Sequence, residues 1–191
     1  MLSSPLFLQF PSSMTDEQFF EFCQMNRDLR IERNKYGEIS IMPPTGSETG
    51  NRNFNLALQL GNWSEKDGTG ICFDSSTGFK LSTGAERSPD ASWISLERWN
   101  SLSEEQQQGF APTCPDFVIE LRSKSDTLKP LQKKMEEYMQ EPGIRLGWLI
   151  DRKNKRVDVY RPQSVECLEN PDTVSGEDVL PGFILNMSRV W

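Results

Sequence analysis

Apolar and ionisable positions alternate in residues 116–122, DFVIELR, in the second half of the chain. Successive side chains of a β-strand point to opposite faces, so Phe117, Ile119 and Leu121 fall on one face. The other face receives the intervening residues, which are Asp116, Val118, Glu120 and Arg122. The pattern predicts a strand with one face in the core and with an acid and a base near its end, where open α/β sheets tend to bind ligands.

Four segments have the pattern of helices. Thr15, followed three residues later by Gln18, is a capping box that opens a helix over residues 15–26. Residues 49–64 are free of proline and contain Phe54, Leu56, Ala57, Leu58, Leu60 and Trp63, which favours a helix. Residues 127–140 place their apolar side chains on one helix face. Residues 95–109, rich in Glu, Gln and Ser, indicate an exposed helical insertion.

Short apolar runs bounded by turn residues predict strands at residues 29–33, 38–42, 70–74, 78–82, 89–94, 116–121, 145–151 and 156–162. Gly37 turns the first two runs into a hairpin, and the polar RKNK turn joins the last two. Residues 43–51, PPTGSETGN, predict a loop. This order of elements is typical of an α/β (α+β) domain in which helices flank a central mixed sheet.

Length and the N-terminal sequence favour one domain. At 191 residues the chain is long enough for a single core, which we place in residues 14–191. Residues 1–13 lack a basic segment and contain Pro5 and Pro11, so we expect a loose leader rather than a targeting signal. No apolar stretch approaches the length of a membrane span, so we expect no membrane contact and a cytoplasmic location.

Composition limits the chemistry. The chain has no histidine, which excludes Ser-His-Asp and Cys-His mechanisms and histidine-based zinc sites. Its four cysteines lie far apart, so neither a zinc ribbon nor a disulfide framework is indicated. The net charge of -7 argues against a protein that coats nucleic acid, although a local basic cleft remains compatible with it. Catalysis would have to use carboxylates, lysine, arginine or a hard metal ion.

Strand geometry selects a pair of acids. Four residues of strand separate Asp116 from Glu120 by roughly 13 Å, too far to share one ion. A partner for Glu120 must come from a neighbouring strand, about 4.8 Å away. Asp90 precedes the apolar run of residues 91–94 and meets this requirement. We therefore expect Asp90 and Glu120 to form the pair, and Asp116 to mark only the start of its strand.

These motifs resemble a known family. Pro89-Asp90 and Glu120, with a base two residues later, are similar to the PD-(D/E)XK nuclease pattern. More specifically, the chain resembles the Uma-two family of restriction-endonuclease-like proteins over residues 14–191. The matching blocks, in order, are MTDEQFFEF, RIERNKYGEISIMPPTG, SPDASWI, PDFVIELRSKSD, KKMEEYMQEPGIRLGWLID, VDVYRP and LPGFILNMSRVW.

The resemblance implies a restriction-endonuclease-like fold, a bound Mg²⁺ or Mn²⁺ ion, and hydrolysis of DNA phosphodiester bonds. It assigns metal binding to Glu32, Asp90 and Glu120. The superfamily lysine two residues after the strand acid is replaced by Arg122, which stays charged and cannot act as a general base. Two lysines are candidates for that role: Lys124, and Lys134 on the following helix, which we favour because it matches a family lysine.

Other interpretations stay open. Glu120 is also explained as a structural acid paired with Arg122 or Lys134, Asp90 as a turn residue, and Glu32 as a solvated acid. A second function is a catalytically decayed member that serves as an interaction module, with Arg122 as the sign of decay. A third is hydrolysis of another phosphoester. The apolar C-terminal segment GFILNMSRVW either joins two subunits in a homodimer or closes the core.

Overall fold

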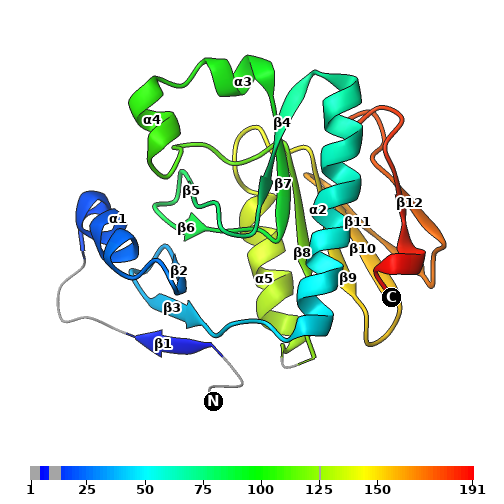
Figure 1. The fold of residues 1–191 in the computed structure, drawn as a ribbon, viewed down its shortest axis with the longest axis horizontal. Helices are drawn as coiled ribbons and strands as arrows, with labels where there is room; N and C mark the ends of the chain where they lie inside the picture. Colours follow the sequence, from blue (N-terminus) through cyan, green and yellow to red (C-terminus); the bar gives the residue numbers. More distant parts are fainter. Residues whose placement is uncertain (1–4, 9–13, 125) are drawn as a thin grey trace.

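A six-stranded mixed sheet forms the centre of the protein in a computed structural model that describes residues 5–8, 14–124 and 126–191 (Figure 1). The strand order is β11-β10-β9-β8-β7-β4. The strands are β4 (Gly70–Asp74), β7 (Ala91–Ser95), β8 (Phe117–Leu121), β9 (Leu146–Asp151), β10 (Arg156–Arg161) and β11 (Ser164–Glu169). β8 and β9 are parallel, whereas the other neighbours in this sheet are antiparallel. The mixed sheet predicted from the sequence is confirmed.

Two long helices cover opposite faces of this sheet. α2 (Ser47–Asp67) packs Leu56 and Leu60 against a core cluster that includes Phe117 and Ile119 of β8. α5 (Leu128–Tyr138) makes the crossover from β8 to β9 and packs Met135 against Val118. The alternation read from β8 is therefore confirmed: its odd-numbered residues face α2, and its even-numbered residues face α5.

A second sheet of five short strands lies beside the first, with the order β1-β3-β2-β6-β5. Its strands are β1 (Leu6–Leu8), β2 (Arg30–Arg33), β3 (Ile39–Met42), β5 (Phe79–Lys80) and β6 (Glu86–Arg87). α1 (Asp16–Met25), opened by the Thr15–Gln18 capping box, packs Phe19 against Ile31 and Ile39. Because β6 leads through Ser88, Pro89 and Asp90 into β7, the second sheet adjoins the first at the end where β7 begins.

The C-terminal segment closes the core. It contains β12 (Thr173–Ser175), β13 (Ile184–Asn186) and a 3₁₀ turn (Met187–Arg189). Leu185, Met187 and Val190 are buried in the cluster that contains the odd-numbered residues of β8. Of the two roles considered for GFILNMSRVW, these contacts correspond to closing the core.

Several sequence predictions need correction. α2 begins at Ser47, inside the segment predicted as a loop, because Gly46 takes the extended N-cap conformation. It ends at Asp67, before the left-handed Gly68 (φ 72°). The insertion at 95–109 is two short helices, α3 (Leu96–Asn100) and α4 (Glu104–Gln108).

Within the segment expected to be a loose leader, Leu6–Leu8 pair with β3, and Leu8 packs on the α1 cluster. The rest of the predicted leader, apart from Pro5, lies outside the described residues. Among the helices that the structure describes, none has both the length and the apolar character needed to cross a bilayer.

Candidate active site

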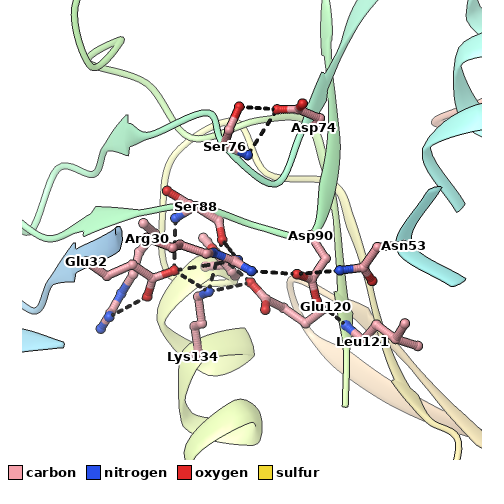
Figure 2. Close-up of polar contacts among 12 residues, drawn as sticks. Arg30, Glu32, Asn53, Asp74, Ser76, Ser88, Asp90, Glu120, Leu121 and Lys134 are labelled. Carbon is pink, nitrogen blue, oxygen red and sulfur yellow. Dashed lines mark hydrogen bonds and ion pairs between the residues drawn. The ribbon is translucent and has the colours of Figure 1, made fainter. Parts of the chain in front are cut away.

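Asp90 and Glu120 lie beside each other where β7 and β8 meet the second sheet. Ala91 pairs with Ile119 across the two antiparallel strands, and Asp90 and Glu120 each lie one residue beyond that pair. The backbone N–H of Asp90 donates to the Ile119 carbonyl at 2.9 Å. The carboxylate Oδ2 of Asp90 accepts from the backbone N–H of Leu121 at 2.8 Å. Asp90 thus replaces a backbone partner of β8, which fixes its carboxylate near Glu120 (Figure 2).

Glu120 is buried under α5. Its Oε1 lies 2.7 Å from the Lys134 ammonium and accepts a hydrogen bond from the Tyr138 hydroxyl at 3.2 Å. Lys134 and Tyr138 are four residues apart, so one face of the helix presents both. Burial raises the pKa of Glu120 to about 7; Lys134 opposes this rise, and the negative charge of Asp90 reinforces it. Near neutral pH both protonation states of Glu120 are therefore populated.

Glu32, on β2, has a different environment. Its Oε1 accepts from Lys134 at 2.8 Å and from the Ser88 N–H at 3.1 Å, and its Oε2 accepts from Arg87 at 3.2 Å. Burial opposes ionisation, but Lys134, Arg87 and Arg30 outweigh it and lower the pKa of Glu32 to about 2. Glu32 is therefore a permanent anion whose described contacts already hold both oxygens.

Arg30 neutralises Asp90. Its NH1 donates to Asp90 Oδ1 at 2.8 Å, and its NH2 donates to the Ser88 carbonyl. Continuous ion pairs link these groups into what we call the β7–β8 ion network. Its acids are Glu32, Asp90, Glu120 and Glu137, and its bases are Arg30, Arg87 and Lys134. The network thus holds one carboxyl group more than it holds cations.

Two of the basic residues proposed from the sequence lie outside this network. Arg122 pairs with Asp151 of β9 at 2.8 Å and donates to the Asp126 carbonyl at 3.1 Å. Lys124, whose side chain is 86% exposed, pairs with Glu48 at the start of α2. Of the two candidate lysines, the structure brings Lys134 to Glu120.

Sequence reasoning did not single out Arg30, Arg87, Tyr138 or Asn53 as residues of the site. Arg30 had a signal, because it shares strand parity with Glu32 on β2. Tyr138 had one too, four residues after Lys134. Asn53, on α2, lies 3.4 Å from Asp90 through its Nδ2 atom, and nothing in its local sequence indicated that contact.

The residues only partly match the expected metal ligands. Within the described part of the chain, no three acidic, histidine or cysteine side chains form a group able to hold a metal ion. Glu32 is the member of the expected triad that does not fit, since cationic side chains hold both of its oxygens, Lys134 at Oε1 and Arg87 at Oε2. Asp90 and Glu120 fit a hard cation better, because they are neighbouring oxygen donors. Among their described ion pairs, a cationic side chain holds one oxygen of each, Arg30 in Asp90 and Lys134 in Glu120.

A solved structure has the same fold. It is described as the crystal structure of a "putative nuclease belonging to DUF820" from Anabaena variabilis, and it matches with a TM-score of 0.72. The match covers 93% of this chain and 97% of that chain at 20% sequence identity. The chain therefore shares the fold of that structure over nearly its whole length.

The sequence identifies the family. Residues 16–188 match the profile of the Uma2 family, described as "Putative restriction endonuclease". The chain belongs to this family, which confirms the resemblance seen in its motifs. No curated protein matches the chain.

Proposed function

We propose that the protein is a metal-dependent endonuclease that hydrolyses phosphodiester bonds of DNA at the β7–β8 ion network. One observation carries the proposal: Asp90 and Glu120, from adjacent strands, lie together with the Lys134 ammonium 2.7 Å from Glu120. Two acids and a lysine supply the ligands and the cation that metal-assisted phosphoryl chemistry requires. Membership of a family described as restriction endonucleases supports DNA as the substrate.

Asp90 and Glu120 would hold the metal ion, Mg²⁺ or Mn²⁺. Both are buried, and their mutual repulsion contributes to the raised pKa of Glu120. A divalent cation beside them would remove that repulsion, and oxygen ligands are the kind that these ions prefer. When bound, the ion would polarise the scissile phosphate and lower the pKa of an attacking water.

Lys134 would place positive charge beside the reacting phosphate. Its ammonium has three acceptors, Glu120 Oε1 at 2.7 Å, Glu32 Oε1 at 2.8 Å and the Ser88 carbonyl at 3.4 Å. Because an ammonium has three N–H donors, these contacts fix its position before substrate arrives. A preorganised cation stabilises the charge that develops in the transition state without further rearrangement. Glu32 then acts on Lys134, as a positioning residue.

The direct test is cleavage. We expect the purified chain to cut single- or double-stranded DNA in the presence of Mn²⁺. Glu120→Gln should lower the rate at least ~100-fold, because it replaces a charged metal ligand with a neutral amide of similar shape. Electrophoresis of labelled DNA measures both rates. Equal cleavage by the two proteins would assign the activity to a contaminant and would remove the support for this site.

Lys124→Ala is the matched control. It removes a lysine that lies outside the network, so cleavage should stay within about twofold of the unchanged protein. Lys134→Met should lower cleavage at least ~10-fold, because it removes the preorganised cation. Equal effects of the two lysine substitutions would contradict the role of Lys134.

A second candidate function has its own observation. Arg30 and Lys134 pair with Asp90 and Glu120, and such pairs would let a catalytically decayed interaction module keep these buried acids. Isothermal titration calorimetry with Mg²⁺ and Mn²⁺, on the unchanged chain and on Asp90→Ala, separates the two functions. A site of millimolar affinity or tighter that Asp90→Ala abolishes favours the nuclease, and no binding to either protein favours the module.

A further inference from the structure

Asn53 of α2 carries a buried oxygen that has no hydrogen-bond partner. The Oδ1 atom of Asn53 is buried, and the described residues provide no hydrogen-bond donor for it. The amide nitrogen of the same side chain approaches Asp90 Oδ1 at 3.4 Å, longer than an ordinary N–H···O bond. Buried polar groups are normally satisfied, so this oxygen calls for an explanation.

Asn53 approaches Asp90 from the side opposite Arg30. Figure 2 shows Arg30 on one side of the Asp90 carboxylate and Asn53 on the other, with Glu120 nearby. Both side chains reach Oδ1 of Asp90, Arg30 at 2.8 Å and Asn53 at 3.4 Å. Oδ1 of Asp90 therefore has the Arg30 cation on one side and, on the side that faces α2, only the weak contact with Asn53.

The proposed metal pair also lacks a third protein oxygen. Glu32, the acid expected in this role, is held by Lys134, Arg87 and the Ser88 N–H. Asparagine carbonyl oxygens are ordinary ligands of hard divalent cations. The last torsion of the Asn side chain is roughly two-fold, so a half turn exchanges oxygen and nitrogen. For Asn53 this turn breaks only the 3.4 Å contact, because Oδ1 has no bond to lose.

We infer that Asn53 Oδ1 is the third protein oxygen of a divalent-cation site whose other ligands are Asp90 and Glu120. The amide nitrogen faces Asp90 when the cation is absent, and the oxygen replaces it when the cation binds. This inference rests on the proposed metal-dependent function, and it adds a ligand from a helix that carries none of the residues expected from the sequence.

Calorimetric titration of the full chain with Mn²⁺ tests the assignment. Asn53→Leu keeps the shape of the side chain but removes its oxygen, and we expect Mn²⁺ affinity to fall at least ~10-fold. Asn53→Asp adds a charged oxygen at the same place, and we expect affinity to rise at least several-fold, since ligand charge strengthens such sites. Asn51→Ala is the control, because Asn51 lies on the same helix but, two residues from Asn53, faces away from it.

The outcomes separate this inference from the proposed function. If Asp90→Ala abolishes Mn²⁺ binding but Asn53→Leu and Asn53→Asp leave it unchanged, the role of Asn53 is overturned and the proposed function survives. If the unchanged chain does not bind Mn²⁺, both fail. Should Asn53→Leu not fold, as judged by circular dichroism, Asn53→Ala takes its place, and the same loss of affinity is required. The rise in unfolding temperature with Mn²⁺ gives a second readout that does not depend on cleavage.

Discussion

Two groups of charges, each with at least one buried acid, lie in neighbouring parts of the molecule and differ in their balance of acids and bases. In the second sheet, Arg33 donates through Nε to Glu86 Oε2 at 2.7 Å, through NH2 to Glu86 Oε1, and through NH1 to the Met14 carbonyl at 2.6 Å. Its guanidinium carbon lies 4.8 Å from the centre of the Phe19 ring. Asp16 and Lys80 complete this group, which we call the Arg33 network.

The Arg33 network joins two acids to two bases, whereas the β7–β8 ion network joins four acids to three bases. Burial raises the pKa of Glu86 as well as that of Glu120. A raised pKa is therefore no sign of function by itself in this protein. The surplus carboxyl group distinguishes the candidate site, because it leaves room for one more cation. The Arg33 network has no such surplus and holds α1 against β2.

The sharpest test of this difference compares the same substitution in both networks. Glu86→Gln breaks the forked pair with Arg33, and we expect the free energy of unfolding to fall by about 3 kcal/mol. Glu120→Gln removes the surplus acid while Lys134 keeps Glu32, so we expect little loss or a gain in stability. Urea unfolding of both variants at neutral pH, without metal, measures the two effects. Equal losses would show that the two networks are both structural.

The pH dependence of stability gives a smaller effect. The pKa of Glu120 is about 7 in the folded protein and 4.5 ordinarily, so between these values the folded state binds the extra proton. Stability from this group is present below about pH 4.5 and is lost as the pH rises through 7. We expect the free energy of unfolding, relative to Glu120→Gln, to fall by ~2 kcal/mol between about pH 5 and pH 8 in the presence of a chelator.

Glu86 is present in both proteins of that comparison, so its own titration cancels. Glu32 has the opposite sign: its pKa of about 2 contributes stability that is lost as the pH falls from about 4.5 toward 2. A stability difference that stays constant across the neutral range would show that Glu120 titrates normally.

The smallest effect is expected outside both networks. The Lys124 side chain is 86% exposed, and solvent screens its ion pair with Glu48. Lys124→Ala should therefore change the free energy of unfolding by less than ~0.5 kcal/mol, as thermal or urea unfolding can measure. A loss comparable to that of Glu86→Gln would mean that exposed pairs matter here as much as buried ones.

Local patterns predicted much of the fold. The alternation of β8 and the capping box of α1 are written in consecutive residues and needed no tertiary information. The start of α2 was missed because Gly46, Ser47 and Gly50 favour turns, and packing of Leu56 and Leu60 outweighs that preference. β11 was missed because its residues are mostly exposed and lack the apolar alternation of a core strand.

The candidate site was less accessible to sequence reasoning. The pairing of Asp90 with Glu120 could be predicted, because the distance between neighbouring strands of a sheet is nearly constant. The contacts of Arg30, Arg87 and Asn53 depend on how the second sheet and α2 pack against the end of β7. The helix and strand periodicity of the sequence does not determine this packing. The preference for Lys134 over Lys124 followed from the family resemblance.

The single helix α5 brings Lys134 and Tyr138 to Glu120, and it brings Glu137 to Arg87. Each helical residue turns the chain by about 100°, so one amino acid inserted between Lys134 and Tyr138 would separate the two from their shared acceptor. Length variation among relatives should therefore be tolerated before and after this helix and avoided within it. In a library of variants that each carry one inserted residue, we expect the variants that still fold to lack insertions between Lys134 and Tyr138.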